Sequence, residues 1–365
     1  MTKTLIHSNE LTKLMRPQDY RGVMLLDGKV LPVKLLEEET LEMRHKCGGL
    51  VPNSRKRWKV KKSLTLIPFI DYLTHDIPVY IIASSENGYE LEKGFEALKE
   101  TGYDLKILIS DESMAETAKV AKKVFPNVII QTCLTHYGRA VDRELKIDGV
   151  KRTMKAIQNK LDAIGDDLLI PTRHYALHRA VKLTNQLADL EYEYGYLIKF
   201  QSALQDIFWG VETETELSEA EDRMNELMSG MDMKRYPYAN RIRRRYKDYY
   251  KKRDIITAFL RYPGLNIPKT TNLIEGFNST TIELRLGSIR GFETEESARN
   301  YVNAMILRYR FHKFKCCKEP FKHLNRKSPI EIANPLNTLN FNFKNSGNDW
   351  IEFCRKLKKQ KDKNS

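Results

Sequence analysis

The chain has 365 residues, of which 41% are hydrophobic and 30% charged, as in ordinary soluble globular proteins. No stretch approaches the ~18 uninterrupted apolar residues of a membrane span, and no apolar core of signal-peptide length opens the chain. The five cysteines are too few, and odd in number, for a disulfide framework. We therefore expect about two domains, a cytoplasmic location and no membrane partner.

The charge balance is strongly basic. Lys and Arg number 62 against 48 Asp and Glu, which leaves a net charge of +14. Such an excess indicates a polyanionic partner, either nucleic acid or an acidic membrane surface, and the charge alone does not choose between them.

Apolar runs typical of strands alternate with stretches of helical periodicity in the first third of the chain. The expected strands are 23–26, 30–36, 63–70, 79–83, 105–109 and 128–130, and the expected helices are 90–101 and 115–125. Pro32 predicts a break or a sheet edge in the second strand, and 37–62 are polar and basic without an assignable pattern. Strands separated by helices of this length predict right-handed crossovers and a layered α/β sheet.

The pattern changes to helix alone from about 137 to 260. Long helices are expected over 151–209 and 215–260, with interruptions near 166–171, Gly210 and 230–237. A further helix carries Asn272 and Glu275, and 298–311 form the last clear helix. The sequence therefore predicts an α/β chain that contains an all-helical insertion.

Three acidic residues occupy positions suited to metal chemistry. Asp27 ends the first strand, Asp111 follows a later strand, and Glu275 lies in the first turn of a helix. Carboxylates at the ends of neighbouring strands and on a facing helix can converge on hard divalent ions. Each residue also has a structural explanation: a hairpin turn for Asp27, a helix cap for Asp111 and a capping box for Asn272-x-x-Glu275.

Three segments resemble the DDE transposases of the Mutator-like group: LLDGKVLPVK, LISDESMAETAKVAKKVFPNVIIQTCLTHYGR and TTNLIEGFNSTTIELRLGSIRGF. That group has an Asp at the end of the first strand and a second Asp before a helix and a Cys-x-x-His stretch. Its third acidic residue lies in a block with Asn, Arg and Gly. The three blocks occur here in order, over roughly 20–140 and 265–330.

The resemblance implies an RNase H-like mixed sheet with flanking helices, interrupted by the helical insertion. The implied divisions are an N-terminal extension (1–19), a core in two parts (20–140 and 266–315), an insertion (141–265) and a basic tail (316–365). Relatives usually carry a DNA-end-binding domain before the first Asp. We expect this chain to lack one, since only 26 residues precede Asp27.

The activity implied by the resemblance is cutting and joining of transposon-end DNA. Asp27, Asp111 and Glu275 would hold two Mg²⁺ ions, with Mn²⁺ as a substitute. The implied partners are double-stranded DNA, as transposon ends and target, and further copies in a homodimer or higher oligomer. The implied location is the nucleoid, or the nucleus in a eukaryote. The alternatives are a catalytically inactive, transposase-derived DNA-binding protein and an RNase H-like nuclease.

The same resemblance marks further residues near the active site: Cys133, His136, Asn272, Asn278 and Arg285. Arg285 and Arg290 would clamp phosphates. Cys133-x-x-His136 is half of a zinc spacing that no second pair completes. It would position groups or contact the scissile phosphate, or else supply a buried Cys and a hydrogen-bonded His.

A basic stretch over 234–261 holds eleven Lys and Arg against two Asp, with tyrosines between them. Its cations could neutralise phosphates and its tyrosines could stack on bases. The alternative is a solvated helix with the tyrosines on its buried face. The expected DNA contacts are Arg241, Arg243, Arg244, Arg245, Lys251, Lys252 and Arg253. The acidic segment 212–226 should face away from DNA, and Trp209 should pack in a core rather than stack on a base.

Overall fold

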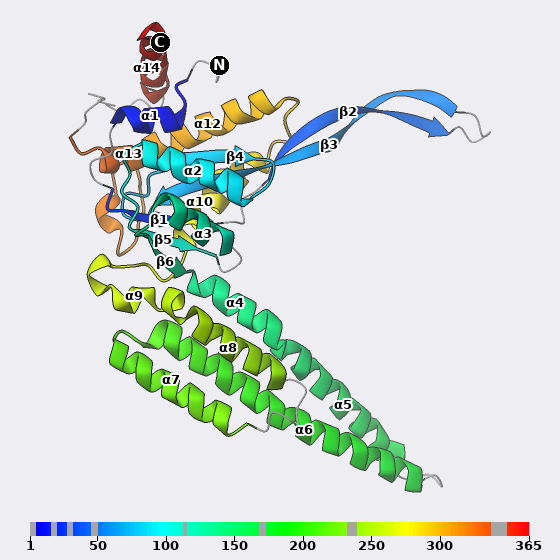
Figure 1. The fold of residues 1–365 in the computed structure, drawn as a ribbon. Helices are drawn as coiled ribbons and strands as arrows, with labels where there is room; N and C mark the ends of the chain where they lie inside the picture. Colours follow the sequence, from blue (N-terminus) through cyan, green and yellow to red (C-terminus); the bar gives the residue numbers. More distant parts are fainter. Residues whose placement is uncertain are drawn as a thin grey trace. The chain divides into compact units, whose positions relative to one another are not determined.

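The structure is a computed structural model that describes residues 5–15, 20–27, 32–44, 50–111, 115–167, 173–231, 239–336 and 349–364. The chain divides into two compact units (Figure 1). The sheet unit comprises Met1–Ile130 and Thr270–Ser365, and the helical unit comprises Gln131–Lys269. The helical unit thus begins at 131, before the insertion boundary expected at 141.

One mixed sheet forms the centre of the sheet unit. Its strands are β1 (Val23–Leu25), β2 (Pro32–Arg44), β3 (Leu50–Asp71), β4 (Val79–Ala83), β5 (Ile107–Ser110) and β6 (Ile129–Thr132). The strand order is β2-β3-β1-β5-β6, and β4 also pairs with β3. The α/β fold expected from the alternating pattern is therefore confirmed.

The direction of the strands is fixed by their pairing with β3. Both β1 and β4 are antiparallel to β3, with Leu25 opposite Ile70 and Ile82 opposite Leu66. β5 is parallel to β1, with Ile109 opposite Leu25. Strands β1, β4 and β5 therefore run the same way, and their carboxyl ends reach the same edge of the sheet.

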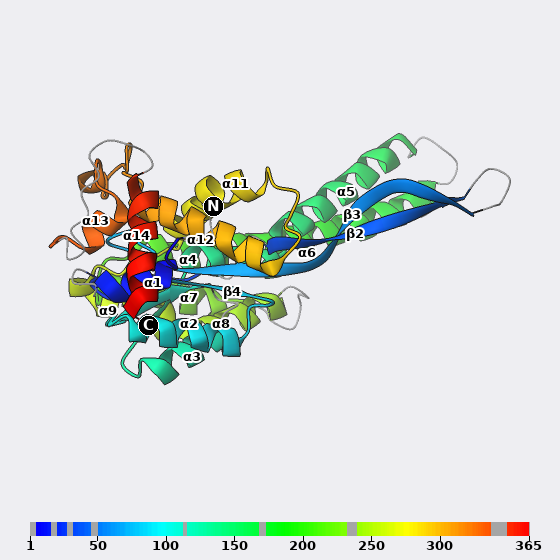
Figure 2. The same ribbon diagram turned by 90° about the horizontal axis from the view of Figure 1, so that it is seen from above.

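Residues 37–44 and 50–62, from the stretch that sequence patterns left unassigned, belong to a long antiparallel pair of strands. β2 pairs with β3 from Pro32 opposite Thr65 to Arg44 opposite Leu50, with two register shifts. β2 begins at Pro32, which suits a residue without a backbone N–H donor. The pair extends well beyond the strands that flank its root (Figures 1 and 2).

Helices cover both faces of the sheet. On one face, α2 (Gly88–Glu100) begins at Asn87, whose side chain accepts the Glu90 N–H at 3.0 Å, and Phe95 packs edge-on against Phe69 of β3. α3 (Ala115–Val124) packs beside α2. On the other face, Leu66 and Ile70 share a core with residues of α10 (Asn272–Phe277) and α12 (Glu295–Phe311). The division follows from the alternation of side chains along β3.

The remaining described elements of the sheet unit are short or terminal. They are α1 (Ser8–Met15), a π-helical turn (Asn278–Glu283), α11 (Leu284–Leu286), a 3-10 turn (Lys322–Leu324), α13 (Pro329–Ala333) and α14 (Asp349–Asn364).

The helical unit contains α4 (Leu134–Leu145), α5 (Ile147–Asp167), α6 (Arg173–Gln205), a π-helical turn (Asp206–Gly210), α7 (Glu214–Ser229), α8 (Ala239–Ile256), α9 (Ala258–Arg261) and a 3-10 turn (Pro263–Leu265). The expected all-helical block and its interruption at Gly210 are confirmed. α5 and α6 pack against each other along apolar positions with heptad spacing, as in an antiparallel coiled coil. These positions are 150, 154, 157, 161 and 164 on α5 and 176, 180, 183, 187, 190, 194 and 197 on α6. In the described part of the chain, no helix is both long and apolar enough to cross a membrane.

A buried ion pair ties the N-terminal helix to the rest of the sheet unit. The Arg310 guanidinium on α12 donates to both Asp76 carboxylate oxygens at 2.8 and 2.7 Å, and both side chains are fully buried. Arg310 also donates to the Ser8 carbonyl and to the Thr12 hydroxyl of α1. The pair is therefore bidentate, and its remaining donors are satisfied by α1.

Replacing one partner of this pair should destabilise the sheet unit strongly. In Asp76→Asn, the Arg310 charge remains buried without its counter-charge, so we expect a loss of about 3–5 kcal/mol in the free energy of unfolding. Denaturant unfolding measures it. Asp104→Asn, which changes a side chain that is 79% exposed, is the control. An Asp76→Asn cost no larger than that of the control would contradict the role of the pair.

Candidate functional site

Asp27 and Asp111 lie side by side at the common edge of the parallel strands. Leu25 is opposite Ile109, and the Leu26 N–H donates to the Ile109 carbonyl at 3.0 Å. Asp27 and Asp111 each stand two residues further along, at equivalent positions on strands that pack about 4.8 Å apart. Asp27 is only 3% exposed and Asp111 is half-buried. The structure thus brings together two of the three acidic residues that the sequence singled out.

A third carboxylate near this pair, Glu86, was missed by the sequence analysis. Glu86 follows β4, directly before the helix cap Asn87. Burial, together with the charges of Asp27 and Asp111, raises the pKa of the Glu86 carboxyl to about 7. Its Oε1 atom is buried and has no hydrogen-bond partner among the described residues. The one available signal was its place after an apolar strand, which it shares with Asp27 and Asp111.

Glu275 is half-buried on α10, a helix that buries Ile274 and Phe277 against the sheet. The interpretation of Asn272-x-x-Glu275 as a capping box is wrong. The helix begins at Asn272, its cap is Thr271, and no side chain makes the capping hydrogen bond. Asn272 therefore lies inside the helix, where it cannot act as the N-cap that a capping box requires.

The chemistry of the acidic residues suits a hard divalent cation. Their donors are all carboxylate oxygens, which Mg²⁺ and Mn²⁺ prefer. The buried, unpartnered Oε1 of Glu86 is a donor that a cation would satisfy. Among the described residues, however, no three Asp, Glu, His or Cys side chains are close enough together to hold a metal ion as they stand. The residues therefore fit such a site in the type of their ligand atoms and in their placement at one edge of the sheet. The distances between their side chains are too long for three of them to bind one ion as they stand.

The other motif residues are placed as follows. Cys133 occupies the N-cap position of α4 and is fully buried, and His136 in the first turn is 3% exposed. Both belong to the helical unit. In the sheet unit, Asn278 is 7% exposed, and within the described chain its Oδ1 has no hydrogen-bond partner. Arg285 is half-buried beside a cavity of about 280 Å³ that α12 and Trp350 also line.

Several of the cations expected to contact DNA are engaged within the helical unit. Arg245 pairs with Glu144 and, at 3.3 Å, with Asp248, and Lys252 pairs with Asp248 at 2.9 Å. Arg253 donates to both oxygens of Glu221 at 2.6 and 3.1 Å. These pairs neutralise much of the charge of α8.

Contacts between α7 and α8 bear on the acidic segment and on the tyrosines. Glu221 of the acidic segment 212–226 pairs with Arg253 of α8, while the expectation that this segment faces away from DNA stays a prediction. Tyr249 donates its hydroxyl to Glu221, and Tyr246 and Tyr250 donate theirs to Asn225. These tyrosines thus fasten α8 to α7 and are not available to stack on bases. Lys234, Arg235, Tyr236 and Tyr238 lie outside the described residues.

The cations of this set that remain exposed are Arg243, Arg244 and Lys251, although Arg244 also contacts Glu144 at 3.1 Å. Arg241 is half-buried. In the sheet unit, Arg290 is exposed. Available cations are therefore fewer than the sequence count suggested.

Trp209 does not pack in the core. It lies in the π-helical turn that follows α6 and is 51% exposed, at the side of a cavity of about 190 Å³ lined by α4 and α6. Its neighbour Phe208 takes the buried position instead, edge-on to Tyr137. The expected core role is wrong because Ile207 and Phe208 take the buried positions of this turn.

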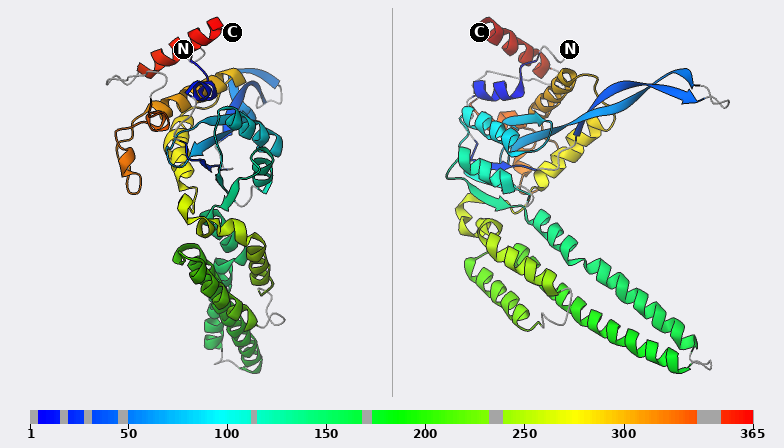
Figure 3. Two further views of the ribbon diagram at one scale, coloured as in Figure 1. Left: turned by 60° about the vertical axis from the view of Figure 1, so that its left-hand side comes forward. Right: turned by 45° about the vertical axis from the view of Figure 1, so that its right-hand side comes forward.

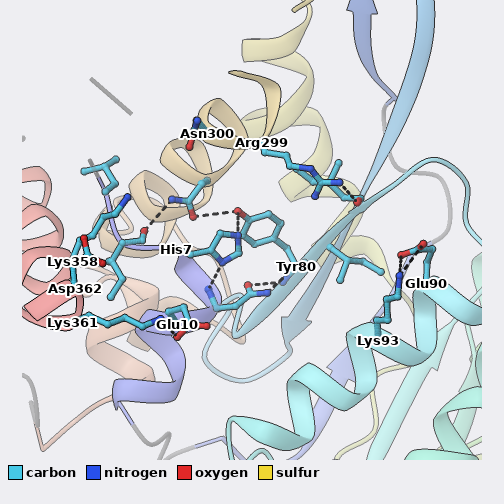
Figure 4. A pocket seen from close by; sticks show the side chains of 16 residues that line it. His7, Glu10, Tyr80, Glu90, Lys93, Arg299, Asn300, Lys358, Lys361 and Asp362 are labelled. Atoms are coloured by element: carbon cyan, nitrogen blue, oxygen red, sulfur yellow. Dashed lines mark hydrogen bonds and ion pairs between the residues drawn. The ribbon is translucent and has the colours of Figure 1, made fainter. Parts of the chain in front are cut away.

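A cavity of about 570 Å³ lies between α1, β4, α12 and α14 (Figure 4). At one side of it, His7 Nε2 lies 2.9 Å from the Tyr80 hydroxyl, which donates to Asn303 Oδ1. Lys361 pairs with Glu10 at 2.6 Å, and Lys93 with Glu90 at 3.4 Å. These polar groups bond to one another. The pair between Lys361 of α14 and Glu10 of α1 connects the two ends of the chain beside this cavity.

The chain matches no protein family for which a sequence profile was compared, and no curated protein.

The ion pairs of α8 predict that its cations contribute unequally to the free energy of unfolding of the protein. Arg245→Ala removes a half-buried cation that Glu144 and Asp248 share, and leaves them with Arg244 and Lys252 alone, so we expect a loss of about 1–3 kcal/mol in unfolding free energy. Arg243→Ala removes an exposed side chain and should change it by less than about 0.5 kcal/mol. Thermal and urea unfolding of the two variants provide the comparison. Equal effects would show that the Arg245 pairs contribute nothing.

Proposed function

We propose that the chain is a metal-dependent DNA transposase of the DDE type, with an RNase H-like core. The observation that carries the proposal is the pairing of Asp27 and Asp111 at the ends of adjacent parallel strands, with Glu86 beside them. Burial and the charges of Asp27 and Asp111 raise the pKa of Glu86, and such a group of carboxylates is unfavourable in a protein unless a cation or a proton compensates it.

The fold supports the proposal. Strands β4, β3 and β1 are antiparallel neighbours, and β5 and β6 continue the sheet on the far side of β1. Helices lie on both faces, and a helical unit separates β6 from α10. This arrangement is the one expected from the resemblance of the three segments to Mutator-like transposases.

Asp27 and Asp111 would hold the metal ions, with Glu86 and Glu275 as the further carboxylates. Bound divalent ions would supply Lewis-acid chemistry at these carboxylates, which would activate water or a 3′-OH and stabilise the leaving oxygen. The protein's own part is to present carboxylates of fixed direction from the rigid ends of β1 and β5. Cutting and joining would then proceed at one site without a covalent protein–DNA intermediate.

The helical unit would bind transposon ends or a second subunit. Its exposed Arg243 and Lys251 would contact phosphates, and the exposed Trp209 could stack on a base. The partners would then be double-stranded DNA and further copies of the chain. The protein would be located with the DNA, in the nucleoid or, in a eukaryote, in the nucleus.

A simple RNase H-like nuclease is the second candidate, and Glu86 favours it. With Asp27 and Asp111, Glu86 supplies a set of three acids from strand ends that does not need Glu275. The two candidates differ in strand joining, which only a transposase performs. An inactive DNA-binding protein would need neither set of acids.

Asp111→Asn tests the activity. It removes one ligand charge while keeping the size of the side chain, so cleavage of element-end DNA in Mg²⁺ should fall by orders of magnitude. DNA affinity should hold or rise slightly, because a charge that repels phosphates is gone. Cleavage and strand joining are measured on gels with labelled ends, and binding is measured by fluorescence anisotropy.

The matched control is Asp104→Asn, which makes the same change at the other end of β5 and should leave cleavage intact. Wild-type protein that cuts no end DNA in Mg²⁺ or Mn²⁺, and binds DNA as the Asp111→Asn variant does, would identify a DNA-binding protein without catalysis. Cleavage without joining would identify the nuclease.

Glu86→Gln tests whether the third strand-end acid belongs to the metal site. Without cation, the variant should be more stable than wild type, because it removes repulsion from Asp27 and Asp111. The stabilisation that Mn²⁺ gives to wild type should shrink, since a ligand is lost. Melting temperatures with and without Mn²⁺ measure both effects.

Glu96→Gln, on the exposed side of α2, is the control for a general change in charge. Equal Mn²⁺ stabilisation of wild type and Glu86→Gln would leave Glu275 as the third ligand.

A further inference from the structure

The part of β2 and β3 beyond the sheet is a two-stranded ribbon, defined here as the β-ribbon (residues 34–44 and 50–62). β4 pairs with β3 only from Thr65 to Phe69, and β1 pairs with β3 only at Ile70 and Asp71. Along the described residues of the β-ribbon, each strand past the root has the other as its sole partner. The views agree that it extends away from the remainder of the sheet unit (Figures 1 to 3).

The root of the β-ribbon is firmly anchored. Val33, Leu35 and Leu64 are buried in the core that α10 and α12 cover. Phe292 forms two backbone hydrogen bonds across it, donating to the Lys34 carbonyl at 2.9 Å and accepting from Leu36 N–H at 2.7 Å. A Cβ at Gly291 would lie 2.5 Å from the Leu36 side chain, so only glycine lets this strap approach so closely. The β-ribbon is therefore held in direction by its root.

Beyond the root the β-ribbon has little to stabilise it. Isolated two-stranded hairpins are marginal in water because neither face is buried. Val60 is 51% exposed, and Arg57, Lys59, Lys61 and Lys62 are exposed. An anchored arm that gains so little from the fold itself is the kind of element that binds something else.

Charge identifies the partner. The sequence stretch 34–62 contains nine Lys and Arg against four Glu, a net charge of +5 in 29 residues, while the whole chain carries +14 in 365. About a third of the net charge therefore lies in less than a tenth of the sequence. This concentration matches a polyanion.

The ion pairs of the β-ribbon leave its cations available. Lys59 lies 3.5 Å from Glu39, and Lys61 lies 3.9 Å from Glu37, with all four side chains at least 38% exposed. Such long, exposed pairs contribute little and are screened by salt. By contrast, Arg253 in α8 is held at 2.6 Å by a buried Glu221. Phosphates can therefore replace the glutamates of the β-ribbon more readily than those of α8.

The dimensions suit duplex DNA. The thirteen residues of the β-ribbon on β3, from Leu50 to Lys62, span about 43 Å at ~3.3 Å per residue, somewhat more than one helical turn of B-DNA. The major groove admits a two-stranded ribbon. We propose that the β-ribbon is a DNA-binding arm whose Arg57, Lys59, Lys61 and Lys62 contact the phosphates of a duplex. The choice of DNA rests on the proposed function, whereas the location of the contact rests on the β-ribbon itself.

The test compares two variants of the full chain that lose the same charge. The arm variant carries Arg57→Gln, Lys59→Gln, Lys61→Gln and Lys62→Gln. The control variant carries Lys151→Gln, Arg152→Gln, Lys155→Gln and Lys160→Gln on α5, where all four residues are also exposed. Binding of a labelled random duplex is measured by anisotropy from 50 to 200 mM NaCl, and circular dichroism verifies folding.

Each phosphate contact contributes about 0.9 to the slope of log affinity against log salt, or about 3.5-fold in affinity over this range. Between 50 and 200 mM NaCl, the affinity of wild type for the duplex should therefore fall by up to about 150-fold more than that of the arm variant, which lacks the four contacts. The control variant should differ from wild type much less. In wild type, DNA should also protect Lys59 and Lys61 from an amine-reactive reagent, as measured by mass spectrometry. Equal losses in the two variants, no binding by wild type, or no protection would overturn the proposal.

A changed sedimentation coefficient of the arm variant without DNA, with an unchanged salt slope, would overturn it in favour of pairing between two copies. The outcome is separate from the test of catalysis. If wild type binds through the β-ribbon but never cuts end DNA, the arm stands and the transposase fails. If wild type cuts end DNA and the arm variant has the same salt slope as wild type, the transposase stands and the DNA-binding arm fails.

Discussion

The direction of the strands around β3 is the constraint on which the candidate site depends. Because β1 and β4 are both antiparallel to β3, they are forced to run the same way, and β5 follows β1 in parallel. Asp27, Glu86 and Asp111 all follow the carboxyl ends of these strands. Residues separated by tens of positions in the sequence thus reach one edge without any of them having to be placed by a long loop.

Buried and half-buried polar groups join segments that lie far apart in the sequence within each unit. Arg310 and Asp76 join α12 to the turn between β3 and β4 and hold α1 by its backbone. In the helical unit, the fully buried Gln131 donates to the Ile256 carbonyl and accepts the Phe259 N–H. Lys269, at the other end, donates to the Phe208 carbonyl at 3.1 Å. Both ends of the helical unit are therefore fixed by hydrogen bonds to its own helices, so a long insertion need not loosen the sheet.

Sequence patterns predicted the parts of the fold that depend on local periodicity. The strands leading to Asp27 and Asp111 and the helix at 90–101 were found because apolar residues repeat with the period of the element that buries them. The strands over 37–44 and 50–62 were missed because this stretch is polar and basic and has no apolar alternation to detect. Glu86 was missed because its importance comes from Asp27 and Asp111, which lie 59 and 25 residues away in the sequence.

The sequence also could not show which side chains pair with one another. This pairing determines which cations are available to bind a phosphate. Eleven cations between 234 and 261 looked like a DNA-binding surface when they were counted along the chain. Folding places α7 beside α8, and Glu221 then engages Arg253 while it also accepts the Tyr249 hydroxyl. A cation held in this way must lose a short, half-buried pair before it can bind a phosphate. A cation on the β-ribbon gives up only a long pair exposed to water. Where a basic protein binds DNA therefore depends less on where its cations are most numerous than on where its own carboxylates hold them most weakly.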